Sequence, residues 1–303
     1  MPLTPLGGTE SIVAVDKKAG EMGAALVSQS FSIGSKAVWA EPCVGVVVAQ
    51  GIVEPSYGSL GLALVRGGKS PAHALKSLLA TDPRPDSRQV MIIDSRGRRA
   101  GHTGKNCMPE AGFLSGRGFC VQANFVNTKR AWRAIAAAFR AERGDLATRM
   151  VAALEAGEQS ARGGRRGGAA KSAAVMVVKM VHGTSPLEGK VLDLRVENAD
   201  NPLRQLKGLL KFREGQERVS LAEDLFAREE LGRAEKEFAR AASLAPDSFE
   251  VKLRLALALF ADGERKRGMS VLRGALGRGQ DANAIFREML ARKIIEEPSS
   301  DVE

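Results

Sequence analysis

A threonine near the start of the chain could act as a nucleophile. Thr9 follows two glycines and opens an alternating apolar segment. At a chain terminus, its α-amino group could serve as general base for its own hydroxyl, as in enzymes that use an N-terminal threonine. In an uncut chain, Thr9 only begins a strand behind an N-terminal tail. The residues alone leave both interpretations open.

Hydroxyl side chains and one lysine near Thr9 in the sequence could assist such a nucleophile. Strand alternation turns Ser11 to the same side as Thr9. Ser28 and Ser35 lie in a small, polar segment after the second expected strand and could contact a substrate. Lys36 is the nearest lysine that could lower the pKa of a nucleophile. The alternatives are hydrogen-bonded structural serines and a solvated lysine.

A second group of candidates lies between positions 102 and 124. His102 could be a general base, because the pKa of histidine lies near neutral pH, and Thr103 beside it could bind substrate. Gln122 and Asn124 face one way at the end of an expected strand, where side-chain amides could donate to an oxyanion. A structural histidine and a turn-anchoring asparagine are the alternatives. Cys107 could pair with His102, but no orienting Asn or Asp is evident, so a packed thiol is favoured.

The strongest basic cluster is the segment Arg-Gly-Gly-Arg-Arg-Gly-Gly at 162–168. Arg165 or Arg166 could clamp a carboxylate or phosphate of a substrate. The segment lacks the lysine and hydroxyl residue of a nucleotide-binding P-loop. Contact with RNA and a plain basic surface loop remain as alternatives. The net charge is +10, but no basic stripe with interleaved aromatics is present, so nucleic acid is not the partner that we expect.

The composition is that of a globular protein of 303 residues, long enough for two domains. Three cysteines are too few and too irregularly spaced for a disulfide framework, and three histidines have no metal-ligand spacing. No basic region followed by a long apolar run opens the chain, and no segment has transmembrane length. We therefore expect a cytoplasmic protein without membrane attachment and without a metal or other cofactor.

The order of apolar periodicities predicts an α+β first domain. Strands are predicted at 11–15, 22–27, 36–40, 44–50, 89–94, 98–103, 119–125, 172–180 and 190–196. Helices are predicted at 60–66, 71–80, 129–143 and 146–156. Strands that come as hairpins pair antiparallel, and both helix pairs have apolar faces that need a sheet to cover them. The economical arrangement is a four-layer α/β/β/α sandwich.

From residue 198 onward the pattern is helical only. We expect a connecting helix at 202–212, helix pairs at 221–244 and 248–276, and a flanking helix at 283–294. Phe238, Ala241, Leu244 and Pro246 have the spacing of the second helix of a tetratricopeptide repeat. Two such units are fewer than the roughly three that usually stand alone, so they would lean on flanking helices or on a partner.

These patterns divide the chain into five expected segments. They are an N-terminal tail or propeptide at 1–8, the sandwich domain at 9–197, a connecting helix at 198–215, a tetratricopeptide-like domain at 216–295 and a tail at 296–303.

Several short motifs recur in a characteristic order within residues 9–197. They include Ser-Ile-Val-Ala-Val-Asp at 11–16, Val-Trp-Ala at 38–40, Pro-Ser-Tyr-Gly at 55–58, His-Thr-Gly at 102–104 with Cys107, Gln122 with Asn124, Gly-Asp-Leu at 144–146, and Arg-Gly at 166–167 before Lys-Ser-Ala at 171–173. In this order they resemble the family called domain of unknown function 1028, which belongs with the N-terminal-nucleophile (Ntn) hydrolases. The resemblance implies the same sandwich and amide hydrolysis as a general theme, without naming a substrate.

The resemblance also bears on Thr9. Ntn hydrolases commonly expose their nucleophile by autocatalytic cleavage, and Gly8 before Thr9 is similar to the cleavage site of proteasome β-subunits. Glycine permits the strained backbone in which the hydroxyl attacks the preceding carbonyl. Cys43, Lys171 and the Pro-Glu pair at 109–110 depart from the family pattern, which bears on substrate preference more than on fold.

Two hypotheses follow. The first is an amidohydrolase for a small amide or peptide-like substrate, in which Thr9 attacks the carbonyl, its freed amine moves the proton, and Asn124 or a backbone amide holds the oxyanion. The C-terminal helices would recruit a protein partner. The alternative is an uncleaved, non-catalytic Ntn-fold scaffold whose helices mediate protein–protein interaction. Self-association into a homo-oligomer stays open in both.

Overall fold

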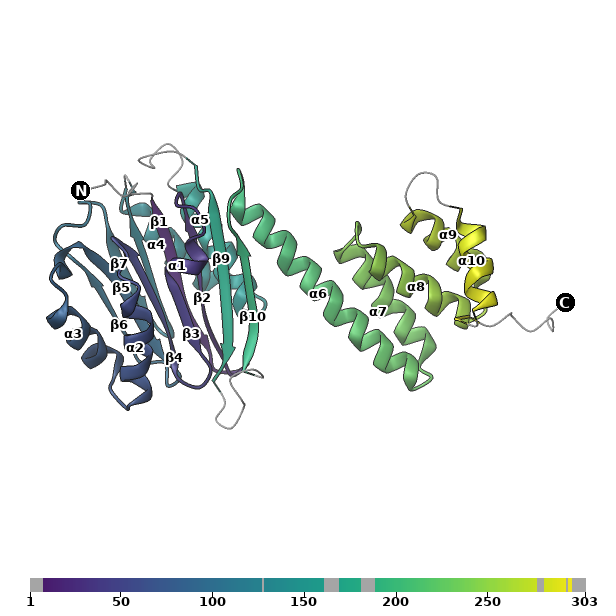
Figure 1. The fold of residues 1–303 in the computed structure, drawn as a ribbon, viewed down its shortest axis with the longest axis horizontal. Helices are drawn as coiled ribbons and strands as arrows, with labels where there is room; N and C mark the ends of the chain where they lie inside the picture. The colour runs from purple at the N-terminus through teal and green to yellow at the C-terminus, as the bar shows by residue number, and fades with distance from the viewer. Residues whose placement is uncertain are drawn as a thin grey trace. The chain divides into compact units, whose positions relative to one another are not determined.

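The computed structural model describes residues 8–126, 128–160, 169–180, 189–276, 281–292 and 294–295. The chain divides into two compact units, Met1–Lys207 and Gly208–Glu303. The first contains two β-sheets with helices, and the second contains helices alone among its described residues (Figure 1). The expectation of a mixed α and β region followed by a helical region is therefore confirmed. Within the described residues, no helix combines the length and apolarity needed to cross a membrane.

The larger sheet has six strands in the order β10-β9-β2-β1-β8-β7, and all of its neighbours pair antiparallel. Its strands are β1 (Thr9–Asp16), β2 (Glu21–Ser28), β7 (Gly112–Gly116), β8 (Phe119–Asn124), β9 (Ser172–Lys179) and β10 (Lys190–Val196). The first strand lies at the centre of this sheet, between β2 and β8. Gly8, the residue before β1, therefore has backbone on both sides, from Gln29 after β2 and from Phe125 after β8.

The smaller sheet has four strands in the order β3-β4-β5-β6, also antiparallel. Its strands are β3 (Val38–Glu41), β4 (Gly45–Gly51), β5 (Arg88–Asp94) and β6 (Arg99–Thr103). The run of valines in β4 predicts a strand that is buried on both faces, and Val46, Val47 and Val48 are all fully buried.

The two sheets pack face to face on an apolar core. Val13 of β1, Leu26 of β2, Val48 of β4 and Met91 of β5 belong to this core, which we call the apolar end of the intersheet layer. Side chains alternate along a strand, so every second residue of these strands points into the same layer.

Helices cover the outer face of each sheet. The helices α4 (Arg130–Ala141) and α5 (Leu146–Ser160) pack on the six-stranded sheet. The helices α2 (Ser56–Arg66) and α3 (Pro71–Thr81) pack on β4, β5 and their neighbours. The start of α3 follows from local chemistry, because Ser70 Oγ accepts a hydrogen bond from His73 N and proline occupies the first helical turn.

Three elements differ from the sequence prediction. β7 lies in a stretch for which no strand is predicted, and α1 (Ile33–Lys36) lies where a polar segment and the start of a strand are predicted. The connecting helix predicted at 202–212 and the first helix of the pair predicted at 221–244 are one helix, α6 (Pro202–Ala227). The residues between them contain no proline and form intrahelical ion pairs.

The helical unit continues from α6 through α7 (Leu231–Leu244), α8 (Phe249–Ala261), α9 (Arg265–Ala275) and α10 (Ala282–Ala291). One apolar cluster joins the last turns of α6 to α7 and α8. A second cluster joins α8, α9 and α10, and it contains Phe260, Met269 and Phe286.

Candidate active site

The layer between the sheets changes from apolar to polar at the end where β1 begins. The side chains there continue the inward alternation of the core, but they carry hydroxyl and amide groups instead of methyls. We call them the polar end of the intersheet layer: Thr9, Ser11, Ser28, Gln50, Gln89, Gln122 and Asn124. Each is at most 4% exposed. Burial of so many polar groups is costly unless they hydrogen-bond, and most of these side chains bond to one another or to backbone groups.

The Thr9 hydroxyl lies on the inner face of the central strand, between two neighbours. Thr9 is the register partner of Ser28 on β2 and of Asn124 on β8. Thr9 Oγ1 and Ser28 Oγ form a 2.8 Å hydrogen bond in which either can donate. Ser28 Oγ also accepts from the backbone N–H of Ser30 at 3.1 Å and keeps a second lone pair that can accept the Thr9 hydroxyl proton. Ser28 therefore fixes the rotamer of the Thr9 hydroxyl.

Hydrogen bonds hold the Gly8–Thr9 peptide group and the backbone atoms on either side of it. Gly8 N donates to Gln29 Oε1 at 2.7 Å, and Gln29 N donates to the Gly8 carbonyl oxygen at 3.0 Å. The Thr9 carbonyl oxygen accepts from Gln50 Nε2 at 3.0 Å. A Cβ added to Gly8 would lie 3.0 Å from the Phe125 carbonyl oxygen, so a larger residue would have to shift this segment. The carbonyl before Thr9 thus has a fixed position with an N–H aimed at its oxygen.

Two glutamines connect this position to the smaller sheet. Ser11 Oγ donates to Gln50 Oε1 at 2.7 Å, and Gln50 Nε2 donates to Gln89 Oε1 at 2.7 Å. Gln89 Nε2 in turn lies 3.1 Å from both Thr103 Oγ1 and the Ala123 carbonyl oxygen. Sequence reasoning missed both glutamines. The sequence did contain a signal for them. Gln50 ends the predicted strand 44–50 and Gln89 begins the predicted strand 89–94, and both fall on the inward side of the alternation.

The Asn124 amide has a fixed orientation and an unused donor. Its Oδ1 accepts from Phe125 N at 2.9 Å and from Met108 N at 3.4 Å. Among the described residues, Nδ2 is buried without a hydrogen-bond partner. Gly51, at a φ of +80°, passes so close that a Cβ there would lie 3.1 Å from Asn124 Nδ2. The arrangement leaves a neutral N–H donor beside the strand position of Thr9. The Gln122 amide, one inward position earlier, likewise has no partner in the described part of the chain.

The structure does not bring every candidate to this end. Lys36 Nζ donates to the Phe31 carbonyl oxygen at 3.1 Å and lies 5.4 Å from the Phe31 ring centroid. Ser35 Oγ bonds Ser32 Oγ at 2.7 Å within the same short turn. His102 Nε2 lies 3.0 Å from the Pro85 carbonyl oxygen. These contacts occupy the three side chains elsewhere, whereas Thr103 joins the glutamine network through Gln89.

Cys107 lies beside the polar end, where its thiol contacts the Asn124 amide. Burial raises the pKa of Cys107 more than the Asn124 amide lowers it, and Sγ donates to the Arg88 carbonyl oxygen at 3.6 Å, so the thiol stays protonated. Arg165 and Arg166 lie outside the described residues. Within the described part of the chain, no group of three His, Cys, Asp or Glu side chains has a metal-binding arrangement.

Comparison with known proteins identifies the family. A family model described as a family of unknown function, DUF1028, matches residues 9–206. The chain belongs to the DUF1028 family. The match begins at Thr9, the residue on which the polar end is centred, and ends within α6, so the helices after residue 206 lie outside it.

Two solved structures are similar to this chain. One is the DUF1028 protein SPO2555 from Silicibacter pomeroyi, with 26% identity, a TM-score of 0.60, and coverage of 67% of this chain and 85% of that chain. The other is Anbu, the ancestral β-subunit from Yersinia bercovieri, with 10% identity, a TM-score of 0.34, and coverage of 67% of this chain and 94% of that chain. The second likeness is too weak to support a conclusion. No curated protein matches the chain.

Proposed function

We propose that this protein is an Ntn-type amidohydrolase in which Thr9 is the nucleophile. The observation that carries the proposal is the environment of the Gly8–Thr9 peptide bond. The Gly8 carbonyl oxygen accepts a hydrogen bond from the Gln29 N–H, and the Thr9 hydroxyl is held by a hydrogen bond to Ser28 Oγ. The sandwich of two sheets and two helix layers, and the family match that begins at Thr9, support it.

The first step is cleavage of this bond by its own hydroxyl. Thr9 Oγ1 attacks the Gly8 carbonyl carbon while its proton leaves along the hydrogen bond to Ser28, and negative charge develops on the Gly8 oxygen. The Gln29 N–H, at 3.0 Å, stabilises that charge. Collapse breaks the C–N bond, returns a proton to the Thr9 nitrogen and leaves an ester. Water then hydrolyses the ester, which releases a Gly8 carboxylate and restores the Thr9 hydroxyl beside the α-amine that cleavage of the C–N bond has freed.

The freed amine completes the nucleophile. It takes the proton from Thr9 Oγ1 as the oxygen attacks the carbonyl carbon of a substrate amide, and it passes that proton to the leaving nitrogen. Asn124 Nδ2, a buried donor without another partner among the described residues, stabilises the oxyanion. Water then attacks the resulting ester and releases the acid. Gln50 and Ser28 position Thr9 and touch no reacting bond of the substrate.

The side chains of the polar end indicate a small amide or peptide-like substrate. The hydroxyls and amides that face Thr9 are neutral, so they can hydrogen-bond to a peptide group without charge pairing.

A second candidate function has its own support. The hydroxyls and amides from Thr9 to Gln89 satisfy one another in a closed network with almost no exposure. Such a network can stabilise the sheet pair without any chemistry. In that case the sandwich is a non-catalytic scaffold, and the helical unit carries the function by binding a protein partner.

Hydrolysis of chromogenic amides separates the two functions. We expect a chain that starts at Thr9 to release nitroaniline from at least one member of a panel of aminoacyl and acyl nitroanilides. Thr9→Ala in the same chain removes the nucleophile and should lower the rate by at least about a thousandfold, whereas Thr9→Ser retains activity. If the unsubstituted chain and the Thr9→Ala chain hydrolyse every reactive amide at equal rates, the hydrolase proposal is wrong and the scaffold function remains.

A further inference from the structure

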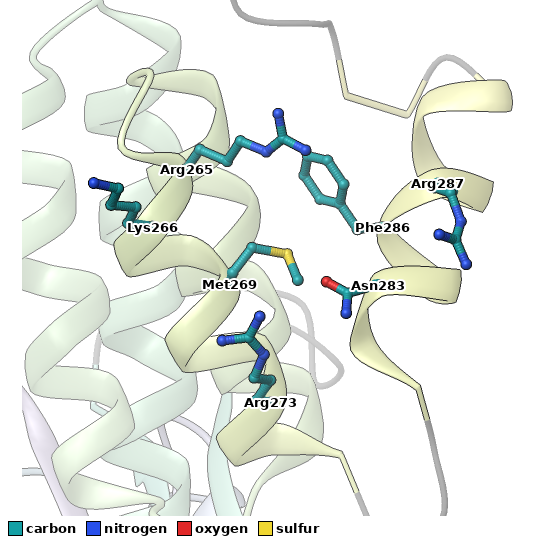
Figure 2. A pocket seen from close by; sticks show the side chains of 7 residues that line it. All are labelled: Arg265, Lys266, Met269, Arg273, Asn283, Phe286 and Arg287. Atoms are coloured by element: carbon teal, nitrogen blue, oxygen red, sulfur yellow. The ribbon is translucent and has the colours of Figure 1, made fainter.

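The helices α9 and α10 of the helical unit border an open hollow. It has a volume of about 590 Å³ and lies between α9 and α10. Its lining residues are Arg265, Lys266, Met269, Arg273, Asn283, Phe286 and Arg287 (Figure 2). This volume is within the range of about 300–1,000 Å³ that ligand-binding hollows usually have.

The floor of the hollow is apolar. Met269 of α9 and Phe286 of α10 are both buried, and Figure 2 shows both side chains in the gap between the helices. Methionine adapts its shape to different apolar partners, and it is common on surfaces that accept varied peptides. The floor therefore fits an apolar side chain of a ligand.

The rim of the hollow is cationic and largely without counter-charge. Lys266 and Arg273 are exposed, and within the described residues neither forms an ion pair or a side-chain hydrogen bond. Arg287 has only a marginal 4.0 Å contact with Asp281. By contrast, Arg267 of the same helix does not line the hollow and pairs with Glu235. Among the described residues, the cations of α9 without an ion pair are therefore those that line the hollow.

The aromatic ring in the hollow is not available for stacking. The Arg265 guanidinium lies 4.9 Å from the centroid of the Phe286 ring, and the Phe260 ring packs on it at 4.7 Å in an edge arrangement. Sequence-tolerant binding of single-stranded nucleic acid relies on exposed aromatic faces next to cations. The hollow has the cations but no free face, so its chemistry favours carboxylates and an apolar side chain over nucleotides.

We propose that this hollow binds an acidic peptide segment of a partner protein. An apolar side chain of the peptide packs on Met269, and flanking Asp or Glu side chains pair with Lys266, Arg273 and Arg265. The occupant follows from charge complementarity, which speeds association and selects against basic partners. This proposal uses residues of the helical unit alone, so it stands or falls independently of the hydrolase proposal.

Fluorescence anisotropy with the full chain tests the proposal. The probe is a fluorescein-labelled peptide that repeats Leu-Glu-Asp-Glu, and the control peptide replaces every acid with its amide. We expect the acidic peptide to bind with a micromolar dissociation constant. Arg273→Glu, and separately Lys266→Glu, should weaken binding at least about tenfold, because each replaces a charge-assisted pair with repulsion. Lys236→Glu is the matched control, since Lys236 is an exposed lysine of α7 outside the hollow, and it should change binding less than about twofold.

Several outcomes would overturn the proposal. Absence of binding to the acidic peptide would refute the site. Equal weakening of binding by Lys236→Glu and Arg273→Glu would mean that the affinity depends on the net charge of the protein and not on the hollow. Displacement of the peptide by a much lower concentration of oligouridine would assign the rim to nucleic acid. Residues 296–303 include Glu296, Glu297, Asp301 and Glu303. Tighter peptide binding by a chain that ends at Ile295 would assign the hollow to this chain's own acidic segment.

Discussion

The two ends of the layer between the sheets are built from the same strands but have opposite chemistry. At the apolar end, residues such as Val13, Leu26 and Met91 pack against one another. At the polar end, inward positions of the same strands carry Thr9, Ser28 and Gln89, linked by hydrogen bonds. The difference shows that stability and function can depend on different parts of the same strands. The apolar end stabilises the sheet pair, and the polar end positions the candidate reactive groups.

The largest expected effect comes from the apolar end. Leu26→Ala should lower the free energy of unfolding by about 2–5 kcal/mol, because the cavity lies in a fully buried core. Tryptophan fluorescence in urea measures it for the sheet-containing unit alone, since both tryptophans, Trp39 and Trp132, belong to that unit. A loss below about 1 kcal/mol would mean that this end is not the main source of stability.

The polar end should respond to the loss of hydrogen bonds. Gln50→Leu removes the partners of Ser11 Oγ, the Thr9 carbonyl oxygen and Gln89 Oε1, and should cost about 1–3 kcal/mol. Gln122→Leu is the matched control in the same layer, because its amide has no partner among the described residues. It should cost nothing or stabilise the unit. Equal urea midpoints for the two variants would contradict the account of the network.

The outer face at this end is ionic, unlike the inner one. On β5, Arg88 precedes Gln89 and lies on the outer face. Its side chain is buried against Asp82, which also accepts a hydrogen bond from the buried Tyr57. The hydrogen bond from Arg88 is the main reason that the pKa of Asp82 falls from 3.8 to about 2.

This shift makes the ionic cluster sensitive to acid. Because the folded pKa is below the unfolded one, the stabilisation of about 2 kcal/mol is present above about pH 4 and is lost as pH falls toward 2. The difference in unfolding free energy between wild type and Asp82→Asn, measured in urea, should shrink by that amount over this range. A constant difference from pH 6 to pH 2 would refute the assignment.

The smallest expected effect concerns a residue outside both ends. Lys36→Ala loses exposed contacts with the carbonyl oxygen and the ring of Phe31, so the urea midpoint should correspond to a change within about 0.5 kcal/mol. Hydrolysis of a nitroanilide by the chain that starts at Thr9 should also stay within about twofold of wild type. A loss of activity as large as that of Thr9→Ala would bring Lys36 into the site.

Period-two alternation was sufficient to predict most strands and the inward direction of Ser11, Gln122 and Asn124. It could not predict the links from Gln50 to Gln89 and Thr9, because those contacts join two sheets and depend on how the sheets stack. β7 was missed because its five residues, Gly-Phe-Leu-Ser-Gly, begin and end with glycine and include only two large apolar residues. α6 was divided in two because its central residues are charged all round, and helix continuity there depends on ion pairs between neighbouring turns.

The central claim is that the Gly8–Thr9 bond is cleaved by the Thr9 hydroxyl, and the intact mass of untagged protein tests it most directly. The account predicts a wild-type mass equal to that of a chain beginning at Thr9, and a Thr9→Ala mass that still includes Gly8 and the residues before it. Gly8→Val should slow the cleavage, because its side chain would crowd the Phe125 carbonyl oxygen. A wild-type chain that keeps its first eight residues intact would contradict the claim and leave the polar end as a structural network.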